Sequence, residues 1–129
     1  MNQPHTIRLR GPWTCQFGDG DQQSAEQRYM GPQGLCQLVP TDYAGPLVLR
    51  RRFHAPPGVM NSPRVDLVID ATSPISAWLN DRLLLECAVE LSRVDIASQL
   101  TPDMELRVEL QVAAGVQLDK VCDAWLEIH

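Results

Sequence analysis

The stretch ISAWLNDRLLL, residues 75–85, decides the fold that we predict for this chain. Apolar and polar side chains alternate over 75–79, which is typical of a half-buried β-strand. Asn80 and Asp81 interrupt the alternation, and a second apolar run follows at 83–85. Asn and Asp tolerate the positive φ angles that a tight turn requires. The stretch therefore predicts a β-hairpin that turns at Asn80 and Asp81.

Short alternating segments recur on both sides of this hairpin. A polar, glycine-rich segment at 18–34 predicts a long loop with a helical turn near 24–29, and 115–120 predicts a turn. A single helical turn is expected at 95–100. About eight short strands separated by turn signals favour an all-β sandwich or barrel. Besides the hairpin, we expect strands at 7–17, 35–38, 47–53, 65–70, 105–112 and 124–128.

The strand parities also predict which side chains form the core. Trp13, Cys15 and Phe17 share one parity and are expected to point inward. Phe53, Leu79 and Val108 are expected to join them. Trp125 is expected to pack in the core or at an edge.

Composition limits the classes of function. The length of 129 residues suits a single domain over 1–129, and a net charge of −5 argues against nucleic-acid binding, which depends on clustered Lys and Arg. The basic run at 50–52 lies in a predicted strand, so its members alternate between two faces. No apolar run approaches the roughly 20 residues of a membrane span. The first ten residues lack the apolar stretch of a secretory signal, so we expect a cytoplasmic chain.

The central arginine of that run requires a partner. Arg51 shares its parity with Leu49 and Phe53, and an unpaired buried charge costs several kcal/mol. If that face is the core, we expect Asp66 or Asp70 to pair with Arg51.

The four cysteines show no C-x-x-C spacing and no adjacent histidine pair, which excludes the usual zinc motifs. We expect four reduced, buried thiols. A bridge between Cys15 and Cys122 stays open if the first and last strands are neighbours.

Other metal ligands are sparse in the sequence. His5, His54 and His129 are scattered and predict no metal or catalytic set. An acidic loop could recruit calcium, but its D-x-D spacing lacks the further ligands that calcium needs. We expect a solvated loop, no metal and no cofactor. The loop acids are Asp19, Asp21 and Glu26.

Four motifs recur in an order that resembles the N-terminal sugar-binding domain of family-two glycoside hydrolases, a galactose-binding-like jelly roll. They are a Gly-x-Trp opening, a Tyr-x-Gly loop before an Arg-Arg-x-Phe strand, a Trp-Leu-Asn strand, and a final Asp-Ile…Leu segment leading to Leu-x-Val-x-Leu. The matching residues are Gly11, Trp13, Tyr43, Gly45, Arg50, Arg51, Phe53, Trp78, Leu79, Asn80, Asp95, Ile96, Leu100, Leu106, Val108 and Leu110.

This resemblance covers nearly the whole chain and implies a jelly-roll β-sandwich of about eight strands. In the family, hydrolysis is performed by a separate barrel domain with two glutamates, for which this chain has no room. The resemblance therefore implies a non-catalytic carbohydrate-binding module rather than an enzyme, acting alone or beside a partner enzyme.

A sugar site needs an exposed aromatic ring and planar polar groups. Trp78 and Asn80 share one strand face, Arg82 follows the turn, and Asp42 and Tyr43 occupy a loop at one end of the predicted sandwich. These five residues are our candidate site for a mono- or oligosaccharide.

Two alternatives stay open. Trp78 could instead pack under a loop or against a second sheet. The domain could also be a protein-interaction or self-assembly module, for example a homodimer, that covers an apolar patch formed by Trp78, Leu83 and Leu85.

Overall fold

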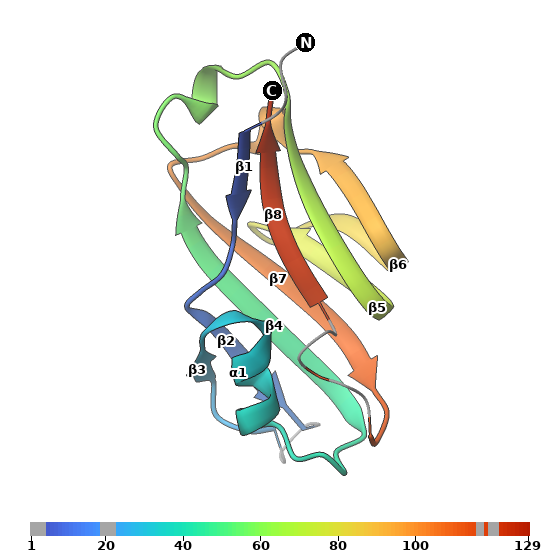
Figure 1. The fold of residues 1–129 in the computed structure, drawn as a ribbon. Coiled ribbons are helices and arrows are strands. Elements are labelled where there is room, and N and C mark those ends of the chain that lie inside the picture. The colour runs from blue at the N-terminus through green and yellow to red at the C-terminus, as the bar shows by residue number, and fades with distance from the viewer. Residues whose placement is uncertain (1–4, 19–22, 116–117, 119–121) are drawn as a thin grey trace.

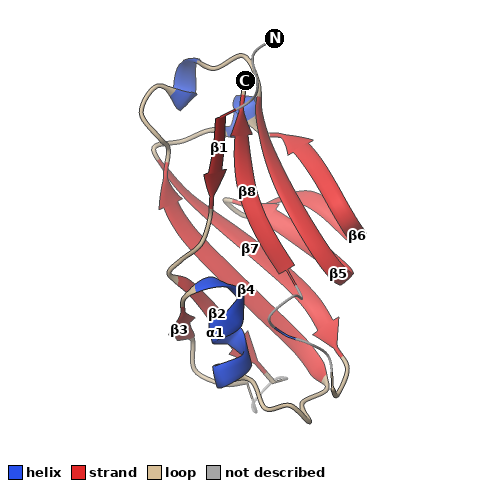
Figure 2. Cartoon of the chain, viewed as in Figure 1, coloured by secondary structure: helices blue, strands red, loops and turns tan. Residues whose placement is uncertain are grey.

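The computed structural model describes residues 5–18, 23–115, 118 and 122–129. These residues form an antiparallel sheet of eight strands, with one short α-helix and two 3-10 turns (Figures 1 and 2). None of the described helices is long and apolar enough to cross a membrane. The elements are β1 (His5–Arg8), β2 (Trp13–Phe17), β3 (Gln27–Tyr29), α1 (Gly31–Leu38), β4 (Gly45–His54), η2 (Val59–Asn61), β5 (Val65–Leu79), β6 (Arg82–Asp95), η3 (Ala97–Gln99), β7 (Asp103–Val112) and β8 (Cys122–Ile128).

The sheet curls into two layers because β5 belongs to both of them. The strand order is β1-β8-β5-β7-β4-β2-β3, and β6 pairs with β5. Residues 65–71 of β5 pair with β8, whereas 75–79 pair with β7, and the β5–β6 register shifts between these halves. Figure 1 shows β1, β8 and β5 crossing in front of β7 and β4. This arrangement confirms the predicted β-sandwich of the jelly-roll type.

The hydrophobic core lies between the two layers and is built by alternating side chains. Trp13, Phe53, Leu79 and Val108 are all buried in one cluster, as their strand parities predict. The indole nitrogen of Trp13 is satisfied inside the protein, since Nε1 donates a hydrogen bond of 2.6 Å to the Leu9 carbonyl. Burial of the polar edge of this ring therefore leaves no unpaired donor.

The hairpin is confirmed at the predicted turn. β5 ends at Leu79, β6 begins at Arg82, and these two residues are direct partners. Asn80 and Asp81 have φ angles of 50° and 66°. Two successive positive φ angles match the right-handed twist of the flanking strands, which is why Asn and Asp serve here without glycine.

Two predictions in the first third of the chain are wrong. Residues 35–38 belong to helix α1 rather than to a strand, and Gln27–Tyr29 form strand β3 rather than a helical turn. Leu35 and Leu38 are three residues apart, a spacing that suits the inner face of a helix. A proline within the first turn is compatible with a helix start. Pairing with β2 places Tyr29 opposite Trp13 and buries it.

The predicted strands at 65–70 and 75–79 are one strand, β5, that continues through the bend. β6 is also longer than the hairpin suggests, and it carries positive φ angles at Cys87 and Glu90. These irregularities let the two-stranded ribbon turn from one layer into the other. Strands at 105–112 and 124–128 and a 3-10 turn within 95–100 are confirmed, whereas most of the predicted turn at 115–120 lies outside the described residues.

The expected carboxylate partner of Arg51 is wrong. Arg51 does face the core layer, but its Nη1 donates to the Arg52 carbonyl and its buried Nε has no partner among the described residues. Asp66 pairs with Arg64 and His129 instead. Asp66 and Asp70 have the opposite parity to the core residues of β5, so they lie on the outer face of their layer.

The cysteine prediction is correct in redox state and only partly correct in burial. All four thiols are free, so the bridge between Cys15 and Cys122 does not form. Cys15 is buried and Cys122 half-buried, but Cys36 and Cys87 are exposed. Burial raises the pKa of the Cys15 thiol to about 11.

Candidate functional site

The outer face of the layer formed by β5, β7 and β4 carries the aromatic residue of the predicted site. Trp78 lies directly across from Arg107 on β7 and from Leu83 on β6. Trp78 is half-buried, and the side chains between the layers have the opposite parity. The indole therefore lies on an outer surface and not between the two sheets.

One face of the Trp78 ring is covered by a cation. The guanidinium carbon of Arg107 lies 4.5 Å from the ring centroid. Arg107 is held there by two ion pairs, at 3.1 Å to Asp81 and 2.9 Å to Glu109. A sugar could stack on this face of the ring only by displacing Arg107. The surface open to a ligand is therefore the remaining edge of Trp78 together with its neighbour Leu83.

Asn80 fastens the hairpin to β7. The side-chain Oδ1 of Asn80 accepts the backbone amide hydrogen of Glu105 at 2.9 Å, and the backbone amide of Asn80 donates to the Glu105 carbonyl at 2.9 Å. Nδ2 donates to Thr101 Oγ1 at 3.1 Å. One amide hydrogen and one lone pair of the side chain remain for a ligand. The position of this amide is consequently fixed before any ligand arrives.

A hollow of about 430 Å³, which we call the hairpin hollow, opens beside Asn80 at the ends of β4 and β5. Its lining combines two buried apolar residues with polar and charged residues, most of which are strongly exposed. Arg52 donates to Glu105 at 2.9 Å, and His54 pairs with Asp103 at 2.5 Å. The lining residues are Arg52, Phe53, His54, Asn80, Asp103, Met104 and Glu105.

Both carboxylates of the hairpin hollow already have side-chain partners. Glu105 contacts Arg52 and, at 3.9 Å, Arg50, while Asp103 contacts His54. The arrangement is suited to holding a polar ligand.

The structure does not bring the five predicted site residues together. Arg82 pairs with the inward-facing Leu79, so it has the opposite parity to Trp78. Tyr43 precedes Gly45, which pairs with Val112, near the opposite end of β7 from Asn80. At about 3.3 Å per residue this separates the two by roughly 20 Å.

The loop residues of the predicted site have local roles. The Tyr43 hydroxyl donates to the Pro46 carbonyl at 2.5 Å and accepts the Gly18 amide hydrogen at 2.7 Å. Its ring contacts Phe17 edge-on, with centroids 5.3 Å apart. Tyr43 thus fastens a loop to the start of β4, while Asp42 is exposed beside it.

Of the predicted acidic loop, two residues cannot be placed. Asp19 and Asp21 lie outside the described residues. Glu26 is exposed and accepts a hydrogen bond of 2.6 Å from Thr14.

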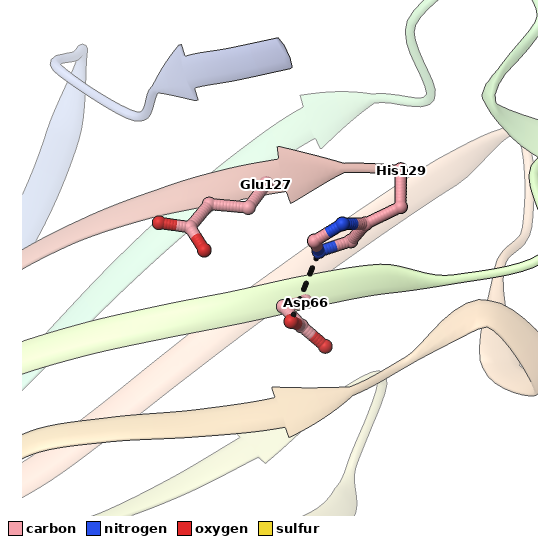
Figure 3. Close-up of side chains that lie close together, drawn as sticks. All are labelled: Asp66, Glu127 and His129. Carbon is pink, nitrogen blue, oxygen red and sulfur yellow. Dashed lines mark hydrogen bonds and ion pairs between the residues drawn. The ribbon is translucent and has the colours of Figure 1, made fainter. Parts of the chain in front are cut away.

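A second cluster, Asp66, Glu127 and His129, was missed by sequence reasoning; we call it the Asp66 cluster (Figure 3). Asp66 and Glu127 are direct partners across β5 and β8, and His129 follows Glu127 at the same strand parity. The donor atoms of all three residues lie within 4.8 Å of one another. The i, i+2 spacing was visible in the sequence, but the partner strand and its register were not.

Cations also surround the Asp66 cluster. Arg64 Nε donates to both oxygens of Asp66, at 3.0 and 3.2 Å, and Arg93 pairs with Glu127 at 3.2 Å. The Trp125 indole donates to Glu127 at 3.1 Å. The hydrogen bonds from Arg93 and then Trp125 hold the pKa of the Glu127 carboxyl below its usual value of 4.5.

Comparison with known proteins supports the fold. No protein-family model and no curated protein matches the sequence. Solved structures of β-glucuronidase from Ruminococcus gnavus do match, one in complex with uronic deoxynojirimycin at a TM-score of 0.72 and 14% identity, over 99% of this chain and 30% of the other. A second, in complex with C6-substituted uronic isofagomine, gives 0.73 and 13% identity over 99% and 30%.

A further crystal structure of the same enzyme gives a TM-score of 0.71 and 13% identity, over 99% of this chain and 29% of the other. The chain thus spans about 30% of the length of these enzymes. At such low identity the match speaks for the fold alone. The resemblance to the sugar-binding domain of family-two glycoside hydrolases is therefore confirmed as a likeness of fold.

Proposed function

We propose that this chain is a non-catalytic carbohydrate-binding module that holds a sugar in the hairpin hollow. The fold likeness to part of a β-glucuronidase supports a module of this type. The observation that carries the proposal is the hollow itself, whose volume of about 430 Å³ falls in the range of small-ligand sites.

The lining of the hollow suits a sugar ring in two ways. The hollow also borders Phe53 and Met104, which face the core and are only 9% and 3% exposed, so they offer the C–H face of a ring a small apolar contact. Arg52, Asn80 and Glu105 supply planar groups that pair with neighbouring hydroxyls. Asn80 is held by its bonds to β7, which lowers the entropy lost on binding.

The positive charge of Arg52, at the edge of the hairpin hollow, indicates which sugars should bind best. The Arg52 side chain is 81% exposed and is held by Glu105 on one side. A guanidinium with free donors can pair bidentately with a carboxylate. We therefore expect sugars that carry a carboxylate to bind more tightly than their neutral counterparts.

The proposal is tested by titrating the full chain with a panel of mono- and oligosaccharides that includes D-glucuronic acid and glucose. Two-dimensional NMR would follow the side-chain amide of Asn80 and the backbone amides of β4 and β7. We expect saturable chemical-shift changes confined to residues of the hairpin hollow. The sugar affinity derived from them should fall at least about tenfold in Arg52→Gln.

Arg8→Gln is the matched control, because Arg8 is an exposed arginine in an ion pair of 3.3 Å with Asp123 in the other layer. Its affinity should equal that of the wild type. Shifts equally reduced in both variants, or no saturable shift with any sugar of the panel, would exclude sugar binding in the hollow.

One observation favours a second candidate, a protein-interaction or self-assembly module. β6 pairs only with β5 within the described part of the chain, and Leu83, Val89 and Leu91 on it are 47–50% exposed. Apolar side chains along an unpaired strand edge favour association. Solution scattering would show a dimer mass, and Leu91→Asp would return it to the monomer; a monomer at every concentration rules self-assembly out.

A further inference from the structure

The Asp66 cluster lies in the layer of β1, β8 and β5, on the side of the sandwich away from the hairpin hollow. Figure 3 shows the His129 ring directed toward Asp66, while the Glu127 side chain lies beside them and extends along β8 away from His129; Glu127 and His129 come from β8 and its end, and Asp66 comes from β5. Asp66 is buried, with only 3% of its side chain exposed, whereas 14% of Glu127 and 36% of His129 are exposed. The cluster is thus anchored at one end and open to solvent at the other.

We propose that Asp66, Glu127 and His129 bind a divalent transition-metal ion, for which Zn²⁺ is the probe. One imidazole and two carboxylates form a donor set that zinc accepts, with water completing the tetrahedron. Metal–ligand bonds of about 2.0–2.2 Å at tetrahedral angles place neighbouring donor atoms roughly 3.3–3.5 Å apart.

The observed distances agree with that requirement. His129 Nε2 lies 3.3 Å from Asp66 Oδ2, which is already the separation of two ligands on one zinc ion. A Glu127 oxygen lies within 4.8 Å of one ligand atom of each of the other two residues. Rotation about the side-chain bonds of Glu127 can cover the remaining distance, which is at most about 1.5 Å, without moving either strand.

The surrounding groups would orient the ligands. Arg64 and Arg93 donate to the carboxylates, and Trp125 donates to Glu127, as outer contacts around metal ligands usually do. The two arginines balance Asp66 and Glu127, while Asp95, which accepts the Val65 amide hydrogen beside Asp66, adds a third negative charge. The metal would replace the hydrogen bond between His129 and Asp66, and Glu127 would turn toward the metal from its present contacts with Arg93 and Trp125.

The test is isothermal titration of the full chain with ZnCl₂ in a non-chelating buffer at neutral pH. We expect one ion per chain. Affinity should fall at least about tenfold in His129→Ala and in Glu127→Gln, because each removes one of three ligands. Both residues are partly exposed, and the melting temperature of each variant would establish that it is folded.

His54→Ala is the matched control. His54 forms the same kind of pair with Asp103, at 2.5 Å, but in the other layer and outside the Asp66 cluster. Its zinc affinity should equal that of the wild type. Equal losses in His54→Ala and His129→Ala would reveal non-specific binding to surface histidines and overturn the site.

Trp125 provides an independent reporter. Its indole nitrogen lies 3.1 Å from Glu127, so a paramagnetic ion such as Co²⁺ in the Asp66 cluster should quench its fluorescence. The quenching should saturate at one equivalent and be absent in Trp125→Phe. Absence of saturable quenching in the wild type, or no zinc binding at all, would refute the proposal.

Discussion

Replacing Arg51 by Met is expected to stabilise the protein, although it removes a charged residue from the centre of β4. Arg51 is half-buried on the inner face between Leu49 and Phe53, and it lies opposite Leu106 on β7. Its buried Nε has no partner among the described residues, and burial lowers the pKa of the guanidinium. The side chain therefore bears a desolvation cost that no described carboxylate offsets.

The magnitude follows from three contributions. An unsatisfied buried donor costs about 1–3 kcal/mol, which the substitution removes, and the hydrogen bond from Nη1 to the Arg52 carbonyl, worth about 1 kcal/mol, is lost. Met keeps the apolar stem of the side chain in contact with its neighbours. The net gain in unfolding free energy is about 1 kcal/mol, which corresponds to about 3–5 °C in melting temperature for a chain of this size.

Urea unfolding followed by tryptophan fluorescence measures the effect as a higher midpoint at unchanged slope. Arg50→Met is the matched control, because the neighbouring Arg50 has the outward parity and donates to Gln16 at 2.6 Å. It should lose about 1 kcal/mol. A loss of more than about 1 kcal/mol in Arg51→Met would refute the argument, because it would reveal a favourable partner for the buried guanidinium.

Three further predictions follow from burial and charge. Leu79→Ala should cost about 2–5 kcal/mol in urea unfolding, because Leu79 is 1% exposed, whereas Leu83→Ala, 49% exposed, should cost under about 1 kcal/mol; equal losses would contradict the assigned faces. Iodoacetamide at pH 8 should label Cys36 and Cys87 in minutes and the other two thiols only on unfolding, since burial raises the pKa of those two to about 11 and about 12. The pKa of the Glu127 carboxyl is lowered in the folded state, so its contribution to stability is complete above about pH 4.5 and is lost as the pH falls further. Glu127→Gln should therefore weaken the loss of unfolding free energy between neutral and acid pH. An unchanged pH dependence would contradict the assignment.

Local chemistry allowed the hairpin and the face of most strands to be predicted. Asn80 and Asp81 tolerate positive φ, and alternation then decides which side chains turn inward, without any knowledge of the partner strands. The prediction for residues 24–38 was wrong because a four-residue pattern such as 35–38 fits both the helical period of 3.6 residues and the strand period of 2. A helix of this length depends on what it packs against, here β3, and β3 itself forms only by pairing with β2, which lies outside the segment.

The continuation of β5 through 72–74 could not be predicted for a related reason. Thr72, Ser73 and Pro74 carry turn-forming composition, yet the strand remains extended there because β6 and two different neighbours, β8 and β7, hold its two halves. Proline is tolerated at such an irregular position because the pairing is already interrupted between Ala71 and Ile75. Tertiary pairing thus overrides the local signal.

At the candidate sites, too, the sequence predicts the strand face on which a residue lies but not the residue that lies opposite it on the neighbouring strand. Parity placed Trp78 on the strand face opposite Leu79, but only the register of β5 against β7 reveals that Arg107 covers its ring. Likewise, the sequence shows Glu127 and His129 on one face of a strand, but not that Asp66 lies across from them. Residues separated in sequence by half of the chain meet through strand order, which one sequence does not specify.

Each of the two layers has an arginine stacked on an outward-facing tryptophan. Arg8 lies 4.6 Å from the Trp125 ring in one layer, as Arg107 lies 4.5 Å from Trp78 in the other. Because a guanidinium covers an outward-facing indole in both layers, this contact shields apolar surface from water and does not by itself mark a ligand site. The argument for sugar binding therefore depends on the hairpin hollow, where polar groups converge on open space, and not on Trp78.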